Sequence, residues 1–380
     1  MDLTFTEEQV ALRDGLARFL DRTYTFDQRQ KLLRSDSAWS ADAWRHFAEL
    51  GLTALPFGED AGGIGGTVAD VVAISEVLGE YLCVEPYAAT VLLAGRSLAL
   101  AASDASGDRA RELLGGIIDG GTTVAFAHEE GRGTPPAAYI GMAATASDTS
   151  DAVRLTGSKE LVIGAEQAAA YVVTARAAGV PGSRDGLVLV LVEADAPGIS
   201  LRDYRTVDGR AAASVEFSDV PGLVLVSDAG AVIDDVIDTA ILGLAAEAVG
   251  AMGALLKITV EYGSTREQFG VPIGTFQALA HRMANMKMAH LQARATLLYT
   301  TAMVEAGTAG ASDIAVLKAQ VGRFGRLIGE SAVQVHGGIG TTDELPVGHY
   351  LKRILAVEAM FGDSDHHLRT VGATAGVVAP

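Results

Sequence analysis

The stretch YGSTREQFGVPIGTFQ, residues 262–277, decides how the last third of the chain folds. Its glycines and its proline interrupt an otherwise helical pattern, because these residues end helices and form tight turns. Runs rich in Ala, Met and Leu lie on both sides of it, at residues 231–262 and 276–307, and another follows at residues 312–336. The pattern predicts long helices joined by turns, as in a four-helix bundle.

The segments that precede this bundle have a different texture. Short β-rich runs separated by Gly, Pro and Asp turns occupy residues 119–226, with no helical run between them, and this spacing predicts a small antiparallel barrel or sandwich. Residues 1–118 read as helices, beginning at Thr6, which is placed to cap a helix whose first turn is acidic. We therefore expect an α+β fold with an N-terminal helical domain (1–118), a middle β domain (119–226) and a C-terminal helical bundle (227–380).

Composition limits the functions to consider. The 380 residues are 49% hydrophobic and 20% charged, which is enough apolar surface to bury a core. Subtracting 47 acidic from 29 basic residues gives a net charge of −18, so neither nucleic acid nor an anionic membrane surface is an expected partner. A single cysteine, Cys83, excludes an internal disulfide and a cysteine-rich metal site. With no secretory signal pattern at the start, we expect a cytoplasmic protein.

The run from Thr239 to Leu256 is apolar enough to raise the question of a membrane span. It contains one charged residue, Glu247, and three glycines, and it is short for a bilayer. We interpret it as a helix buried inside a soluble protein. The pair His366–His367 lacks further ligands at a recognisable spacing, so no metal site is expected.

Two segments of the last third carry side chains suited to a dinucleotide. In residues 262–277, Arg266 offers a planar cationic fork for a diphosphate and Phe269 offers a flat apolar surface. In the segment QVHGGIGTT, residues 334–342, Gln334 can donate and accept hydrogen bonds. The adjacent Gly337 and Gly338 have no Cβ to keep a ligand from the backbone. The alternative is that Arg266 caps a helix or pairs with Glu261, and that the glycines merely end a helix.

These two segments resemble the signatures of the acyl-CoA dehydrogenase family, Y-x-x-x-R-x-x-F-G-x-P-I-x-x-F-Q and Q-x-x-G-G-x-G, and the helix–β–helix order is similar along the whole chain. The resemblance implies an FAD cofactor, partly held across a subunit boundary. The matching cofactor-binding positions are Arg266, Phe269, Gln277, Gln334, Gly337 and Gly338. It also implies dehydrogenation of an acyl-CoA thioester to the 2-enoyl-CoA, in which a glutamate takes the α-proton and flavin N5 receives the β-hydrogen as hydride. Electrons would pass to an electron-transfer flavoprotein.

The position of that glutamate departs from the common pattern. Many family members carry it in a segment like I-Y-E-G-T near the C-terminus, but here residues 359–363 read AMFGD. Some branches place it on the helix before the arginine signature, where this chain has Glu247, and we therefore expect Glu247 to be the catalytic base. A lone carboxylate in an apolar helix loses hydration and becomes a stronger base, and small residues such as Gly250 leave room beside it. The alternatives are a structural carboxylate bonded to a neighbouring helix, and Asp363 as the base.

The β domain also departs from the family pattern. The usual T-E-P-like turn reads FAHEEG at residues 126–131, and the usual K-x-W-I-T-like strand reads GSKELVI at residues 157–163. Flavin contacts from this part would then come from the backbone near Phe126 or from His128. One alternative is that His128 is a turn residue with a solvated ring. Another is that the part of the FAD site that this subunit contributes is impaired. For the CoA phosphates, the candidate cations are Arg210, Lys257 and Arg353.

Three further segments, at residues 243–252, 348–353 and 361–368, look most like the small-subunit branch often labelled pimeloyl-CoA dehydrogenase. Related actinobacterial steroid-degrading dehydrogenases form mixed tetramers of two unlike subunits. The resemblance thus implies a homotetramer or an α2β2 heterotetramer. It leaves two alternatives to a complete dehydrogenase: a non-catalytic subunit that completes the FAD site of its partner, and an acyl-CoA oxidase that consumes oxygen.

Overall fold

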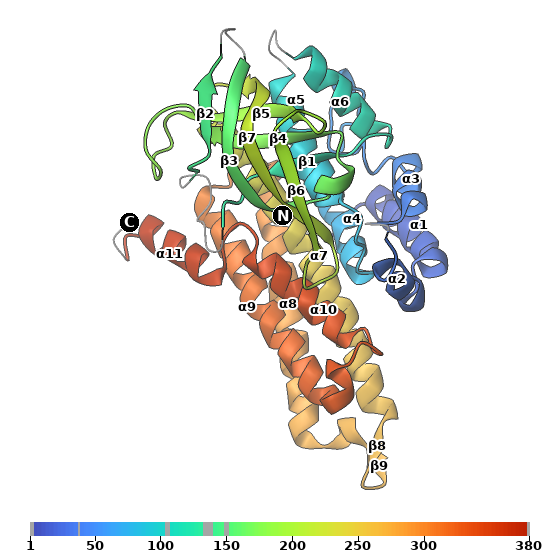
Figure 1. Cartoon of the computed structure of the whole chain (residues 1–380). Helices are drawn as coiled ribbons and strands as arrows, with labels where there is room; N and C mark the ends of the chain where they lie inside the picture. The colour runs from blue at the N-terminus through green and yellow to red at the C-terminus, as the bar shows by residue number, and fades with distance from the viewer. Residues whose placement is uncertain (1–3, 37–38, 103–106, 132–139, 148–151, 378–380) are drawn as a thin grey trace. The chain divides into compact units, whose positions relative to one another are not determined.

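The computed structural model describes residues 4–36, 39–102, 107–131, 140–147 and 152–377 (Figure 1). The chain forms two compact units. The first, here the helical unit, comprises residues 1–30, 68–83 and 241–380, and the second, the β unit, comprises residues 31–67 and 84–240. The N-terminal stretch of the sequence contributes to both units.

Long helices form the helical unit, and their bounds lie close to those that the sequence predicts. They are the end of α7 (Gly230–Thr265), α8 (Gln277–Glu305), α9 (Ala311–His336), α10 (Val347–Ala359) and α11 (Ser364–Thr374), together with α1 (Glu7–Thr23) and α4 (Val68–Glu80). The short turns η4 (Ile273–Thr275) and η5 (Gly337–Thr341) precede α8 and follow α9. In α1, the Thr6 hydroxyl accepts a hydrogen bond from Gln9 N and the Gln9 side chain accepts one from Thr6 N, which confirms the predicted cap.

Helix α7 contains the apolar run that raised the membrane question. By length and composition it is the one helix among the described residues that could cross a bilayer, but 83% of its most apolar window is buried inside the protein. This burial supports its interpretation as a core helix. A two-stranded hairpin, β8 (Glu267–Gln268) with β9 (Val271–Pro272), connects α7 to the short turn η4 (Figure 1).

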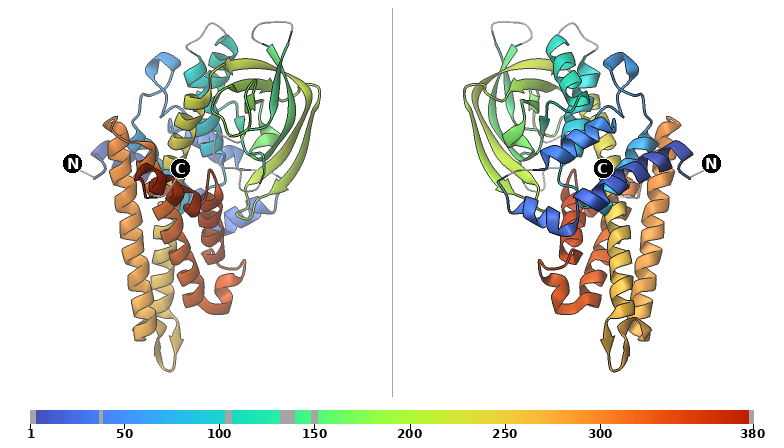
Figure 2. Two further views of the ribbon diagram at one scale, coloured as in Figure 1. Left: turned by 90° about the vertical axis from the view of Figure 1, so that its left-hand side faces the viewer. Right: turned by 90° about the vertical axis from the view of Figure 1, so that its right-hand side faces the viewer.

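The β unit is built on a seven-stranded sheet. Its strands are β1 (Val124–Ala127), β2 (Ala143–Ala146), β3 (Ala152–Ile163), β4 (Ala170–Arg176), β5 (Leu187–Glu193), β6 (Ile199–Arg205) and β7 (Ala211–Val226). The order is β1-β4-β2-β3-β7-β5; β5 also pairs with β4, which closes the path, and β6 pairs with β7. Figure 2 shows these strands curling around a common interior, as expected for a small barrel.

The sheet differs from an all-antiparallel arrangement in two pairings. Strand β4 is parallel to β1 and to β2, while the other pairings are antiparallel. Strands β4 and β5 are buried almost along their whole length, which explains their continuous apolar sequence. The unit also contains α3 (Ala41–Glu49), η1 (Glu59–Ala61), η2 (Ala88–Gly95), α5 (Arg96–Ala101), α6 (Asp108–Ile118), η3 (Ala165–Gln167) and the first turns of α7. Helix α2 (Phe26–Leu33) crosses the division between the units.

Candidate functional site

The two motifs of the last third meet at one end of the helical bundle. Tyr262, from the first motif, stacks on His336, from the second, with ring centroids 4.3 Å apart and an interplanar angle of 23°. His336 Nδ1 lies 2.8 Å from Ala332 O, a contact that fixes the ring on α9. Because Tyr262 lies one turn before Arg266 and His336 directly precedes Gly337, this contact brings the predicted cofactor residues of both segments to the same end.

The hairpin at this end exposes its two predicted ligand-binding side chains. Ile273 N donates to Arg266 O and closes the hairpin. The Arg266 guanidinium is exposed and makes no hydrogen bond or ion pair with any described residue, so the alternative that it pairs with Glu261 is not observed. Phe269 at the tip is 93% exposed, and its ring meets Phe276 edge-on, with ring centroids 6.0 Å apart.

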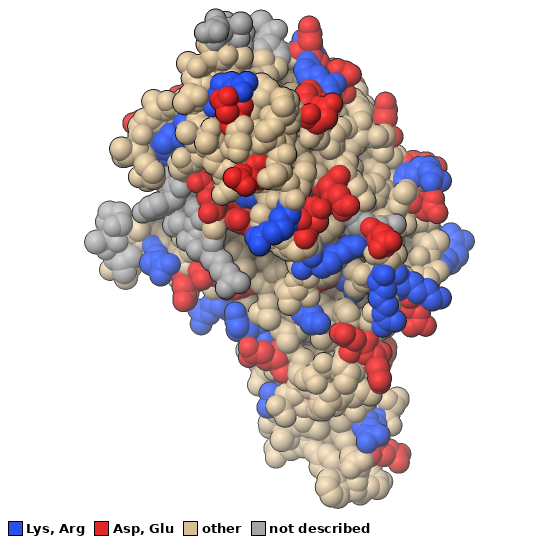
Figure 3. Space-filling view, in the orientation of Figure 1, with Lys and Arg blue, Asp and Glu red and all other residues tan. Residues whose placement is uncertain are grey.

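The glycine turn that follows α9 is open to the surroundings. Gly337 ends the helix with φ +66°, and its N–H donates to Val333 O, so one role of this glycine is to cap α9. A Cβ at Gly337 or Gly338 would meet no atom within 4 Å, and the Gln334 side chain is exposed. Gln277, the first residue of α8, is exposed as well. Figure 3 shows the hairpin end of the bundle as largely uncharged surface.

Glu247 is buried but is not solitary. The side chain on α7 is 6% exposed and faces Arg353 on α10, which is 4% exposed. Arg353 Nε donates to Glu247 Oε1 at 2.8 Å and Nη2 donates to Oε2 at 2.6 Å, a two-point ion pair. The expectation of a lone carboxylate is therefore wrong: a residue 106 positions later supplies its counter-charge. Arg353, a predicted candidate for the CoA phosphates, is thus bound to Glu247. Arg210, another candidate, is buried and forms an ion pair with Asp208.

The space expected beside Glu247 at Gly250 is filled by helix α4. A Cβ at Gly250 would lie 1.9 Å from Glu76 O on α4, and a Cβ at Gly253 would lie 3.1 Å from the imidazole of His290 on α8. These glycines permit close helix packing. The prediction that Gly250 leaves room for a thioester is contradicted by this contact.

The C-terminal turn holds no glutamate at the position of the family motif. Phe361 occupies it, buried and in the left-handed region with φ +55°. The Asp363 side chain accepts a hydrogen bond from His366 N at 2.8 Å and caps α11. Lys318 Nζ donates to Glu358 O and Gly362 O, and burial lowers the pKa of Lys318 to about 8. The turn is thus fixed by a buried cation, and Asp363 serves a helix end.

In the β unit, the ring of His128 is buried rather than solvated, which overturns the solvated-turn alternative. It stacks on Phe126 with centroids 5.8 Å apart and an interplanar angle of 17°, and its Nδ1 lies 3.2 Å from Thr174 Oγ1. Burial, with a smaller contribution from Lys159, lowers the pKa of His128 to about 3, so the ring is neutral. Its predicted role as a flavin neighbour stays a prediction.

Sequence reasoning missed the residue that organises this turn. Lys159, fully buried on β3, donates from Nζ to His128 O at 3.0 Å, to Glu130 Oε1 at 2.6 Å and to Thr174 Oγ1 at 3.1 Å. Burial lowers its pKa to about 8 even though Glu130 favours the charged form. The available signal was the lysine of the K-x-W-I-T-like strand, which this chain keeps while the aromatic residue is lost.

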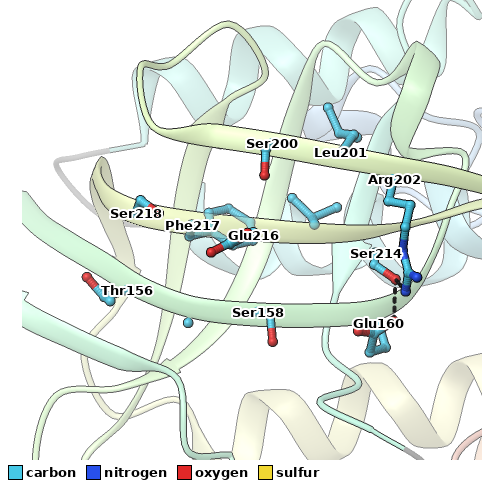
Figure 4. Close-up of a pocket in the computed structure, with 12 residues that line it drawn as sticks. Thr156, Ser158, Glu160, Ser200, Leu201, Arg202, Ser214, Glu216, Phe217 and Ser218 are labelled. Carbon is cyan, nitrogen blue, oxygen red and sulfur yellow. Dashed lines mark hydrogen bonds between the residues drawn. The ribbon is translucent and has the colours of Figure 1, made fainter.

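A groove of about 600 Å³ lies on the outer face of β3, β6 and β7 (Figure 4). Hydroxyl side chains line much of it, and Glu160 accepts a hydrogen bond from Ser214, which accepts one from Arg202. None of the predicted site residues lines this groove. Within the described ranges, no group of three or more His, Cys, Asp or Glu side chains is placed to hold a metal ion.

The chain combines a small closed sheet with a helical bundle, and one end of the bundle exposes an arginine, an aromatic ring and a glycine turn. This is the arrangement of a three-domain flavin-dependent oxidoreductase. Residues 6–120, 125–220 and 231–376 match the N-terminal, middle and C-terminal domains, respectively, of acyl-CoA dehydrogenases. The chain belongs to the acyl-CoA dehydrogenase family.

Its relatives include acyl-CoA dehydrogenase FadE27 of Mycobacterium tuberculosis, 27% identical over 98% of each chain. The ChsE4–ChsE5 complex of M. tuberculosis contains a chain that matches with a TM-score of 0.88 and 25% identity over 100% of both chains. A variant of the Tcur3481–Tcur3483 steroid ACAD matches with a TM-score of 0.87 and 28% identity, over 97% of this chain and 98% of the other.

FAD is the cofactor that membership of this family brings, and the residues at the end of the bundle fit it. The unpaired Arg266 guanidinium suits a diphosphate, the exposed Phe269 ring suits an apolar part of the dinucleotide, and the surface over Gly337 is open to close approach. Lys257 remains as an exposed candidate for the CoA phosphates.

Proposed function

We propose that this chain is a subunit of an assembly that dehydrogenates an acyl-CoA thioester to the 2-enoyl-CoA and passes the electrons to an electron-transfer flavoprotein. The observation that carries the proposal is the end of the helical bundle. Arg266, Phe269 and Gly337 are exposed there, and the Arg266 guanidinium makes no hydrogen bond or ion pair with any described residue. Groups arranged in this way suit a cofactor held jointly with a neighbouring subunit.

In this proposal, bound FAD supplies the acceptor for the hydride that leaves the β-carbon. The chain's own residues bind and orient. The Arg266 guanidinium neutralises a diphosphate, Phe269 excludes water from part of the dinucleotide, and the backbone near Gly337 approaches it closely. The Tyr262–His336 stack keeps these groups in register at one end of the bundle.

An exposed apolar face on α8 supports an oligomer. Met288, Leu291 and Tyr299 are 56%, 53% and 47% exposed and follow one another at intervals of three and eight residues, which places them on one side of the helix. Large apolar side chains gathered in this way favour a protein interface. Two of the solved relatives, the ChsE4–ChsE5 complex and the Tcur3481–Tcur3483 steroid ACAD, are named as pairs of subunits, and we propose an α2β2 assembly, with the homotetramer as the alternative. We also propose a cytoplasmic location, since a chain with a single cysteine can form no internal disulfide and suits a reducing compartment.

The test is to purify the chain alone and after co-expression with the product of the neighbouring gene. We expect the complex to carry FAD, and we expect an acyl-CoA of one class to bleach the flavin absorbance without oxygen. A screen across acyl-CoA types then identifies the substrate class. Oxygen consumption without an electron-transfer flavoprotein would instead indicate an oxidase. Absence of flavin from both preparations would overturn the proposal.

A further inference from the structure

The segment GHYLKR, residues 348–353, lies in the first turns of α10, and its polar side chains bind four other parts of the helical unit. His349 contacts α2, the Tyr350 hydroxyl donates to the carbonyl end of α4, Lys352 reaches the turn that follows η5, and Arg353 binds α7. This segment is therefore a point where several elements of the unit are joined, and one of them is the turn that carries the predicted cofactor-binding glycines.

His349 is buried, and both of its ring nitrogens face other side chains. Nδ1 lies 3.2 Å from Arg29 Nη1, and Nε2 lies 3.2 Å from Gln30 Nε2 and 3.6 Å from Asp343 Oδ1. A guanidinium can only donate, so Nδ1 accepts and the proton of the neutral ring is on Nε2, where a carboxylate can accept it. Burial, with Arg29 and Lys352 nearby, lowers the pKa of His349 to about 4, so the ring is neutral near pH 7.

The segment that follows the glycine turn is held from two helices. Asp343 comes three residues after Gly340. Gln30 Nε2 on α2 donates to Asp343 O at 2.7 Å, and Lys352 Nζ on α10 lies 3.5 Å from Asp343 Oδ1. A Cβ at Gly348 would lie 3.5 Å from Gly340 O, so the start of α10 is in van der Waals contact with the turn itself. The backbone and the carboxylate of Asp343 are thus bound by α2 and α10 together.

The glycine turn is consequently fixed at both of its ends. Before it, His336 stacks on Tyr262, and after it, Asp343 is bound to α2 and α10. Gly337 and Gly338 have no side chains that could fix the turn from within, and glycine loses more conformational freedom on ordering than any other residue. A turn that is already held in place loses less entropy when a ligand binds to it.

We propose that His349 is a positioning residue for the FAD-binding glycine turn, which it holds through Nε2 and Asp343. The proposal rests on the proposed function and deepens it, because it assigns a role to a side chain that touches neither cofactor nor substrate. The alternative is that His349 only provides a buried acceptor for Arg29, whose Nε donates to Leu82 O at the end of α4. The two roles use different ring nitrogens, so substitutions can separate them.

The experiment compares His349→Asn with His349→Gln in the apo assembly. The Asn amide can occupy the place of Nδ1 and accept from Arg29, but it is too short to reach Asp343. The Gln amide can reach the place of Nε2, but it leaves the place of Nδ1 empty. FAD affinity is measured by quenching of flavin fluorescence, and the melting temperature is measured on the same samples.

We expect His349→Asn to keep the melting temperature of the wild type and to bind FAD roughly fivefold to tenfold more weakly, as for the loss of one hydrogen bond. We expect His349→Gln to lower the melting temperature and to keep the FAD affinity of the wild type. Equal FAD affinities in the two variants, or affinities that follow the melting temperatures, would overturn the proposal.

Asp343→Ala covers the case in which the histidine variants do not fold, because this side chain is 71% exposed. We expect FAD binding to weaken by a similar factor, and the effect not to add to that of His349→Asn. FAD binding as tight as in the wild type, or tighter because an acid has been removed, would contradict the proposal. His46→Asn is the matched control: His46 Nδ1 lies 3.2 Å from Glu49 Oε2 on α3, and its loss should leave FAD affinity unchanged.

Hydrogen exchange of the backbone amides of residues 337–343, measured without FAD, separates this proposal from the proposed function. We expect faster exchange in His349→Asn than in the wild type, and exchange like that of the wild type in His349→Gln. A wild-type assembly that binds no FAD would refute the proposed function. The exchange rates would still decide whether His349 holds the turn, and equal rates in all three proteins would show that it does not.

Discussion

The tip of the β8–β9 hairpin combines an exposed aromatic ring with an unfavourable backbone conformation. Phe269 and Gly270 have φ values of +55° and +80° between the paired residues Gln268 and Val271. Positive φ at both central positions is the requirement of a type I′ turn, for which Asn-Gly is the preferred sequence. A left-handed Phe costs about 1–2 kcal/mol relative to an ordinary conformation. Because Phe269 is 93% exposed, few contacts within the chain offset the cost of its conformation. Such a combination is typical of a residue retained for binding.

We therefore predict that Phe269→Asn separates stability from cofactor binding. The substitution relieves about 1 kcal/mol of backbone strain and loses an exposed aromatic contact with Phe276 worth roughly 0.5 kcal/mol. The free energy of unfolding of the apoprotein should change by less than about 1 kcal/mol. If the Phe269 ring becomes buried against FAD, its loss costs about 1.5–3 kcal/mol of binding free energy. That cost corresponds to roughly 10- to 100-fold weaker binding.

The assay is a titration of the apo assembly with FAD, followed by quenching of flavin fluorescence, beside urea unfolding of the same samples. Val271→Thr, on the adjoining strand of the hairpin, keeps the β-branched shape and serves as the control; its FAD affinity should equal that of the wild type. Unchanged FAD affinity in Phe269→Asn would refute the reasoning. So would a loss of affinity that merely follows a loss of stability.

Three further predictions follow from single contacts. Gly250→Ala should destabilise the fold by roughly 1–3 kcal/mol, because the new Cβ would lie 1.9 Å from Glu76 O. Gly15→Ala in α1 should instead stabilise the fold by about 0.5–1 kcal/mol, because its Cβ would meet no atom within 4 Å. Thermal unfolding measures both effects. Tyr262→Ala should weaken FAD binding by loosening the stack on His336, while Tyr262→Phe should match the wild type in the same titration. The unfolded chain protonates His128 below its ordinary pKa of 6.5, but the folded chain does so only near 3, so stability falls as the pH drops below 6.5. His128 alone should cost about 2 kcal/mol at pH 5, and His128→Asn should remove that part of the slope in urea unfolding.

Local patterns explain what the sequence predicted well. The helix bounds and the Thr6 cap depend on residues within a few positions of one another, so spacing and residue type suffice to place them. The family resemblance assigned the segments around Arg266 and Gly337 to the same cofactor, FAD. Each segment follows a long helix, and the structure adds the ring contact that joins them, Tyr262 with His336.

Contacts between distant segments explain what the sequence did not predict. Strand β4 is parallel to β1, with β2, β3 and the short turn η3 between them among the described residues, and no local pattern distinguishes that pairing from an antiparallel one. The burial of His128 depends on Lys159 and Thr174, which lie 31 and 46 residues later. A histidine in a glycine-flanked, acidic turn looks solvated until the strands that cover it are in place.

Glu247 shows how a count of neighbouring charges misleads when the neighbours in sequence are not the neighbours in space. The apolar run around it indicates burial correctly, and burial of a carboxylate requires either a raised proton affinity or a partner. Spacing along one helix cannot choose between these outcomes, because the partner, Arg353, comes from a helix 106 residues away. The sequence did contain a relevant signal: Glu76 and Gly79 on α4 repeat the spacing of Glu247 and Gly250 on α7. Glu247 has a matched counterpart, Glu76, at a close helix crossing, so a structural role can explain why it is buried. A catalytic role for Glu247 needs evidence that does not apply equally to Glu76.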